Sequence, residues 1–189
     1  MARTRSKEAH EKVLSAAFDL IAERGIEAAT MDAIAAASGV SKATVYKHWK
    51  NKDDLLIDVI RQRSSGYPEF NSGDPRTDIL NLLRHLASRV KHEELARIWP
   101  RIISYAMGNP NFGKALQQYV FAPRREMMVR LLREAFEKNG LRADVDPEFA
   151  MDLLIGPIMH RRFIDEGNVP ADLPERVVDY FWKTFERPA

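Results

Sequence analysis

The sequence predicts an all-α protein in which a small three-helix unit at the N-terminus joins a larger helical body through a fourth helix. Three observations support this prediction. Apolar residues recur every three or four positions along most of the chain, as on the buried face of a helix. Helix-capping residues and Gly or Pro breakers separate these stretches. No stretch alternates apolar and polar residues as a half-buried strand does, so we expect about nine helices and no sheet.

The first helix is expected to begin near Ser6, a possible N-cap, and to end at Gly25. Its buried face is marked by six apolar residues at helical spacing: Val13, Leu14, Ala17, Phe18, Ile21 and Ala22. Thr30 then provides a cap for a second helix that runs to about residue 37.

Residues 30–54, TMDAIAAASGVSKATVYKHWKNKDD, carry the most informative pattern in the chain. The second helix runs into Gly39, which suits the positive φ of a tight turn, and Ser41 caps a third helix that reaches about Trp49. The stretch 33–52 contains no acidic residue and holds four lysines, Lys42, Lys47, Lys50 and Lys52. A helix, a glycine turn and a polar, basic second helix form the arrangement that inserts into the DNA major groove. The stretch therefore predicts DNA binding.

A fourth helix, capped by Asn51, follows this motif. Its apolar face is formed by Leu55, Leu56, Val59 and Ile60. Residues 64–75, SSGYPEFNSGDP, are rich in turn-forming residues and are typical of a linker. We therefore expect a helix-turn-helix DNA-binding domain at 1–52, a connecting helix and linker at 53–73, and a second helical domain at 74–189.

The second domain is expected to be helical throughout. Asp74 and Pro75 open its first helix with a cap and a first-turn proline. Further helical patterns cover residues 93–107, 111–138, 147–165 and 174–186. Pro100 and Pro123 fall within two of these patterns, and each is expected to kink or break its helix.

The composition excludes several classes of protein. The net charge of +2 is carried by residues 1–66, whereas the remainder of the chain is balanced. The absence of cysteine excludes disulfides and thiolate zinc sites, and the histidines lack metal-ligand spacing, so we expect neither a metal nor a cofactor. No nucleophile–base pair or glycine-rich phosphate loop suggests an enzyme. The N-terminus has no apolar segment of a signal peptide, and no apolar run approaches the roughly 20 residues of a membrane span. We therefore expect a cytoplasmic protein with no membrane partner.

The run AAFDLIAERGIEAATMDAIAAASGVSKATVYKHWKNKDDLL at 16–56 resembles the TetR family of bacterial transcriptional regulators. The resemblance extends without gaps over about 50 residues and includes the helices on both sides of the helix-turn-helix. Residues 68–87 and 146–185, including LLIGPIMHRRF, are similar to a common type of TetR regulatory domain. This resemblance implies a homodimer, a palindromic DNA operator and a small-molecule effector that binds in the second domain.

The candidate DNA contacts lie in and around the helix-turn-helix. Lys47 and Lys52 are expected at phosphates, and Tyr46 and His48 donate to phosphates at the matching positions of the family. Thr44 and Lys47 are expected to face base edges. Two interpretations of Arg3 and Arg5, near the N-terminus, fit the sequence equally well: a contact with the minor groove and a disordered tail. The full candidate set is Arg3, Arg5, Thr30, Ser41, Lys42, Thr44, Tyr46, Lys47, His48 and Lys52.

The candidate effector pocket lies within residues 95–160, where Met and aromatic residues are dense around two prolines. Its expected lining is Trp99, Ile103, Met107, Phe112, Tyr119, Met127 and Met128. These side chains offer few polar groups, so the expected effector is mostly apolar. Taken singly, each of these residues is more often plain core, and the family resemblance is what favours a pocket.

The last two helices are apolar over a wider arc than one buried stripe needs. We therefore expect part of this surface to meet a second subunit and to form a four-helix bundle, with burial inside one chain as the alternative. The candidate interface residues are Leu154, Pro157, Ile158, Val178, Phe181 and Trp182.

These patterns predict a ligand-responsive transcriptional regulator, read as a repressor that binds double-stranded DNA as a homodimer. An activator would use the same DNA-binding chemistry. A different class, an architectural or interaction protein without an effector, would be favoured by a second domain that contains no cavity.

Overall fold

The computed structural model describes residues 2–63, 70–92, 94–138, 141–142, 144–165 and 168–187, with the backbone alone at 2–6, 89–92 and 94–97. These residues contain no β-strand, which confirms the predicted all-α fold. α7 (Pro110–Leu116), the π-helix η1 (Gln117–Phe121) and α8 (Ala122–Lys138) follow one another without a break. The chain divides into two compact units, Met1–Gly66 with Arg97–Phe121 and Tyr67–Ala96 with Ala122–Ala189.

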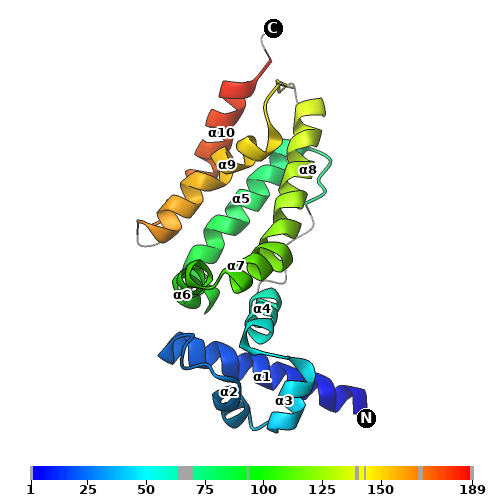
Figure 1. Ribbon diagram of the computed structural model, residues 1–189. Coiled ribbons are helices and arrows are strands. Elements are labelled where there is room, and N and C mark those ends of the chain that lie inside the picture. Colours follow the sequence, from blue (N-terminus) through cyan, green and yellow to red (C-terminus); the bar gives the residue numbers. More distant parts are fainter. Residues whose placement is uncertain are drawn as a thin grey trace. The chain divides into compact units, whose positions relative to one another are not determined.

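The first unit holds the helix-turn-helix. Its helices α2 and α3 follow α1 in the chain, and α1 contacts both α2 and α4 (Figure 1). α7 and η1, which belong to the second stretch of this unit (Arg97–Phe121), both contact α4. The first stretch of this unit contains α1 (Ala2–Arg24), α2 (Met31–Ser38), α3 (Lys42–His48) and α4 (Lys52–Arg63). The second stretch begins at Arg97, inside α6 (Glu94–Gly108).

Three predicted helix caps are confirmed. The Thr30 hydroxyl accepts a hydrogen bond from the Ala33 N–H at 3.1 Å. The Ser41 hydroxyl accepts from the Thr44 N–H at 3.3 Å, and the Asn51 side-chain oxygen accepts from the Asp54 N–H at 2.9 Å. Each bond satisfies an N–H group that has no partner within its own helix. The helix-turn-helix is therefore delimited by short-range chemistry that is visible in the sequence.

The start of α1 differs from the prediction. The helix begins at Ala2, so Ser6 lies inside it and is not its N-cap. Residues 2–6 contain no Gly or Pro that would stop the helix from extending in this direction. The other end is as expected, because α1 ends at Arg24 and Gly25 follows with φ of 88°.

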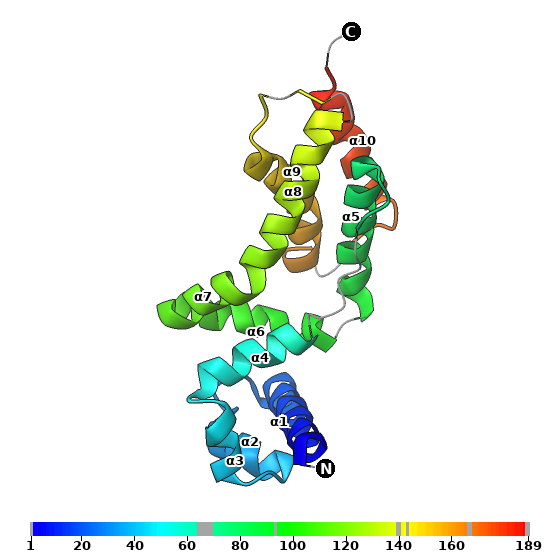
Figure 2. The same ribbon diagram turned by 90° about the vertical axis from the view of Figure 1, so that its right-hand side faces the viewer.

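The second unit is a bundle of α5 (Pro75–His92), α8, α9 (Pro147–Phe163) and α10 (Leu173–Phe185), which lie alongside one another (Figure 2). α5 contacts each of the other three helices. Ion pairs join α5 to α10, with Arg76 2.6 Å from Asp179 and Arg84 2.7 Å from Glu175. The Arg84 guanidinium lowers the pKa of Glu175. The core residues of the bundle include Ile79, Leu83, Met128, Leu132, Leu154, Ile158, Phe181 and Trp182.

The two prolines behave differently from each other. α6 continues through Pro100, so the helix is not broken there. At Pro123, which lies in the first turn of α8, the wider π-helical turn of η1 ends two residues before the proline, at Phe121. A proline has no N–H for the helical ladder, and a π-turn is one way in which a helix accommodates a local disruption.

Substitution of Gly39 is expected to destabilise the first unit. Gly39 adopts φ of 67°, and a Cβ built there meets no atom within 4 Å, so a cost that arises at the Cβ comes from the backbone conformation. Gly39→Val should lower the free energy of unfolding by about 1–2 kcal/mol in urea denaturation. The control is Gly156→Ala, also without neighbours within 4 Å but inside α9, which should raise stability by roughly 0.5–1 kcal/mol. Equal stability of Gly39→Val and wild type would refute the strain argument.

Candidate nucleic-acid interface and pocket

α3 presents most of its side chains to solvent. Val45 is fully buried and Trp49, the C-cap residue, is 4% exposed, so these two side chains fix the helix on the first unit. Tyr46 is 50% exposed, and Lys47 and His48 are also exposed. A helix that is anchored by two apolar residues and otherwise polar and basic is suited to meet a phosphate-lined groove.

The start of α3 is organised by its own hydrogen bonds. The hydroxyls of Ser41 and Thr44 lie 2.9 Å apart, and the Lys42 ammonium donates to the Asp32 carboxylate at 2.7 Å. The hydrogen bond and charge of Asp32 raise the pKa of Lys42. Among the described residues, no carboxylate forms an ion pair with Lys47. Lys47 is therefore the lysine of α3 whose charge is open to a partner.

Lys52 lies at the first position of α4, as predicted, but its ammonium already has neighbours. Its side chain is 22% exposed, and Nζ lies 3.4 Å from the Ile26 carbonyl oxygen and 3.8 Å from a Glu27 carboxylate oxygen. The ammonium also lies 5.1 Å from the centroid of the Tyr105 ring. These partners are distant in sequence, so no local pattern could have indicated them.

The remaining candidates divide into two groups. Thr30 is exposed and uses its hydroxyl as the cap of α2. Arg3 and Arg5 belong to the first turns of α1, and their side chains lie outside the described residues.

A polar cluster that sequence reasoning missed joins α6 to α4 within the first unit. The Tyr105 hydroxyl donates to the Asp53 carboxylate at 2.9 Å. The Asn109 amide donates to the Tyr105 hydroxyl at 3.2 Å and to Asp53 at 3.3 Å. Burial, followed by the hydrogen bond to Asp53, raises the pKa of Tyr105. Arg101 donates to the carbonyl oxygens of Ile21 and, at 2.8 Å, of Ala22, near the C-terminal end of α1.

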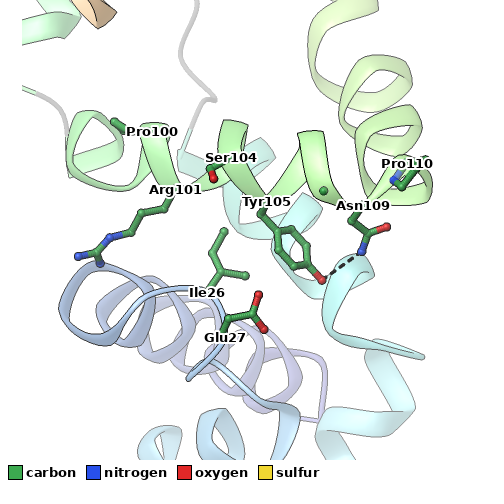
Figure 3. A pocket seen from close by; sticks show the side chains of 9 residues that line it. Ile26, Glu27, Pro100, Arg101, Ser104, Tyr105, Asn109 and Pro110 are labelled. Atoms are coloured by element: carbon green, nitrogen blue, oxygen red, sulfur yellow. Dashed lines mark hydrogen bonds between the residues drawn. The ribbon is translucent and has the colours of Figure 1, made fainter.

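A cavity of about 690 Å³ lies beside this cluster, lined by α6 and by the segment that follows α1 (Figure 3). Its lining combines apolar surfaces with several hydrogen-bonding side chains: Pro100, Pro110, Tyr105, Arg101, Ser104, Asn109 and Glu27. In Figure 3 the Arg101 side chain extends toward the end of α1. The volume is in the range of small-molecule sites.

None of the seven residues predicted to line an effector pocket lines this cavity. Trp99, Phe112 and Met128 are buried, at 8%, 0% and 1% exposure, and Met128 belongs to the core of the second unit. Met107 and Tyr119 are exposed, at 83% and 51%. Ile103 and Met127 are half-buried. Burial within the chain's own units therefore accounts for three of the seven.

The predicted interface residues also lie largely inside the chain's own core. Five of them are almost fully buried in the second unit: Leu154, Ile158, Val178, Phe181 and Trp182. Pro157 is exposed. The apolar side chains that α9 and α10 do expose include Leu153, at 39%, and Tyr180, at 68%. These two, with Pro157 and Val177, line an apolar groove of about 410 Å³.

The described residues contain neither a group of side chains placed to hold a metal ion nor a helix that could span a membrane. No group of three or more His, Cys, Asp or Glu side chains in that part of the chain is placed to hold a metal ion. None of the described helices combines the length and the apolar character that a bilayer span requires.

Fold and site together define a helix-turn-helix regulator of transcription. The family model for bacterial regulatory proteins of the tetR family matches residues 13–59, and the tetracyclin repressor-like C-terminal domain matches residues 71–181. The chain is 34% identical over 173 residues to the HTH-type transcriptional regulator YdeS of Bacillus subtilis, covering 88% of this chain and 85% of YdeS. This protein belongs to the TetR family.

The chain is also similar to a named repressor and to a solved structure of the family. The chain is 24% identical to the DNA-binding transcriptional repressor TetR of Mycobacteroides abscessus, over 79% of each protein. The crystal structure of the TetR family transcription regulator SCO0332 superposes with a TM-score of 0.65 at 30% identity, covering 91% of this chain and 97% of that one. The resemblance stated from residues 16–56 is thus confirmed.

Proposed function

We propose that this regulator is a homodimeric repressor that binds a palindromic operator through α3 and releases it when a small molecule binds. The observation that supports this proposal is the exposed polar surface of α3. Tyr46, Lys47 and His48 are open to solvent, whereas Val45 and Trp49 are buried and anchor the helix. Thr44 would face base edges, and Tyr46, Lys47, His48 and Lys52 would contact phosphates. The M. abscessus relative, described as a repressor, supports the direction of regulation.

The dimer places two copies of α3 on one operator. Its interface would use the exposed apolar surface of α9 and α10 around Leu153, Pro157 and Tyr180, a groove that is mostly apolar. Two-fold symmetry of the dimer would require an inverted repeat, with half-sites roughly 34–36 Å apart or a multiple of that spacing.

The effector would be a small, mostly apolar molecule with one or two polar groups. The cavity beside α6 supports this composition, because Pro100, Pro110 and Tyr105 offer apolar surface and Ser104 and Asn109 offer hydrogen bonds. Release of the operator requires that the effector bind more tightly to the DNA-free arrangement of the dimer than to the DNA-bound one.

A regulator without an effector is the second candidate. It is favoured by the burial of Trp99, Phe112 and Met128, which fill cores instead of lining a cavity. A screen for compounds that raise the melting temperature separates the two candidates, because a ligand that binds only the folded protein stabilises it. An activator, which would use the same contacts, is separated by a transcription assay on the selected operator.

Selection of duplexes from a random library tests the DNA-binding proposal. The full-length protein should enrich one inverted repeat, and footprinting should protect both half-sites. No enrichment over a protein-free control would overturn DNA-sequence recognition. Enrichment of a single half-site without a repeat would overturn the symmetric dimer on DNA.

Lys47→Ala should weaken binding to all DNA sequences by a similar factor. Lys47 is exposed, and no ion pair with a described carboxylate neutralises it, so a phosphate contact there would release a counterion. The slope of log K against log salt should fall in magnitude by about 1. Lys52→Ala should change the slope less, because Glu27 already lies near that ammonium. Lys183→Ala, at an exposed position of α10, is the control and should leave the slope unchanged. An unchanged slope for Lys47→Ala would remove Lys47 from the phosphate contacts.

A further inference from the structure

An exposed ion pair joins the two helices of the helix-turn-helix. Lys42 is the first residue of α3, and its Nζ lies 2.7 Å from the Oδ2 atom of Asp32, in the first turn of α2. The two side chains are 64% and 58% exposed. They are ten residues apart in the sequence, on opposite sides of the turn at Gly39. The pair therefore lies on the surface of the motif and not in the core of the first unit.

Asp32 is the acidic residue that borders the basic part of the motif. The stretch 33–52, which contains all of α3, has no Asp or Glu. Among the described residues, no carboxylate forms an ion pair with Lys47, the other lysine of α3. The two lysines of this short helix are both exposed and differ in one respect. Lys42 has a carboxylate beside its ammonium group and Lys47 does not.

The position of the ion pair matters because of how a helix-turn-helix docks on DNA. The N-terminal residues of the second helix approach the bases, while the first helix crosses the phosphate backbone. Lys42 begins the second helix, and Asp32 lies near the start of the first. On DNA, phosphates would compete with the Asp32 carboxylate for the Lys42 ammonium, and they would also repel that carboxylate.

We propose that Asp32 restrains sequence-independent DNA binding by keeping the Lys42 ammonium away from phosphates. This inference rests on the proposed DNA-binding function. An exposed ion pair changes an equilibrium constant by about 1.5- to 5-fold. A single phosphate contact gains a similar factor, roughly 3-fold, when the salt concentration falls from about 0.2 M to about 0.05 M. Because the two effects are similar in size, the carboxylate competes effectively with a phosphate for Lys42.

A purely structural role for Asp32 would give a different result. A carboxylate in the first turn of a helix interacts favourably with the helix dipole, and Asp32 occupies such a position in α2. That interaction stabilises the fold and does not require Lys42. Helix stabilisation by Asp32 therefore affects the melting temperature, whereas the proposed restraint affects the salt dependence of DNA binding and depends on Lys42.

The test measures binding of the full-length protein to a mixed-sequence duplex over a range of salt concentrations. Asp32→Asn should bind about 1.5- to 5-fold more tightly than wild type at about 0.05 M salt. Its slope of log K against log salt should increase in magnitude by about 1, because the released Lys42 gains a phosphate. Lys42→Ala should keep the wild-type slope, unlike Lys47→Ala. The double variant of Asp32→Asn and Lys42→Ala should lose the increase in slope.

Asp179→Asn is the matched control. It removes the same charge from an exposed ion pair of the second unit, in which Asp179 lies 2.6 Å from Arg76, and it should keep the wild-type affinity and slope. The melting temperature of each variant, measured on the same samples, reports any loss of helix stability separately.

Three results would overturn the inference while DNA binding itself stands. They are an unchanged slope in Asp32→Asn, a smaller slope in Lys42→Ala, and a double variant that keeps the full increase. The second result would mean that Lys42 already contacts a phosphate in wild type, and the third that the increase does not come from Lys42. A wild-type protein that binds no duplex at any salt concentration would instead overturn the DNA-binding proposal, and this inference with it.

Discussion

Ile158→Asp is expected to unfold the second unit instead of only separating two subunits. Ile158 is 0% exposed and lies in the core formed by α5, α8, α9 and α10. The substitution removes a buried aliphatic side chain and buries a carboxylate without a partner, at a combined cost of about 5 kcal/mol or more. Urea denaturation should show this loss, together with reduced helical circular dichroism for the residues of the bundle.

Leu153→Asp is the matched control for this result. It makes a similar change on the same helix, but Leu153 is 39% exposed, so no full desolvation of the carboxylate follows. Any stability that Leu153→Asp loses through dissociation should depend on protein concentration, whereas the loss in Ile158→Asp should not. Equal stability of Ile158→Asp and wild type would show that Ile158 is not a core residue.

The helix-turn-helix could be predicted almost to the residue because its limits depend on local chemistry. Thr30, Gly39 and Ser41 act through hydrogen bonds and dihedral angles that involve neighbours three residues away at most. The same holds for the helical stretch 111–138, which the structure places at 110–138. Local signals of this kind do not depend on how distant segments pack.

The pocket and the interface could not be predicted in the same way, because both depend on which apolar residues remain exposed after folding. Met128 and Phe112 were predicted to line a pocket. Both side chains are instead buried inside the folded chain. A periodic pattern shows that a face is apolar but does not show which element covers it. For the same reason Trp182 appeared as an interface residue and is found in the core, while Tyr180 is exposed.

Polar groups that pair across long sequence distances escaped prediction entirely. Tyr105 meets Asp53 across 52 residues, and Arg101 reaches Ala22 across 79. Neither pair has a spacing that distinguishes it from solvated surface groups. His10 and Asp58 form a third example, separated in sequence and joined through α1 and α4.

Tyr180→Asp should convert the proposed dimer into monomers and reduce operator affinity by about 100-fold or more. Tyr180 is 68% exposed and lines the apolar groove with Leu153 and Pro157, so a carboxylate there leaves the single chain intact but would be buried without a partner at a subunit contact. Loss of the second subunit removes the advantage of two linked DNA-binding units, which is worth about 10²–10⁴ in affinity.

Sedimentation velocity and operator titration measure the two effects on one sample. Met107→Asp makes a comparable change at a side chain that is 83% exposed in the first unit, and it should keep the oligomeric state of wild type. Helical circular dichroism of Tyr180→Asp should match wild type, because the altered side chain lies outside the core. An intact dimer in Tyr180→Asp would place the subunit contact on another surface. A monomeric variant with unchanged operator affinity would show instead that one DNA-binding unit accounts for the whole affinity. The dimer would then add no binding free energy by linking two half-sites.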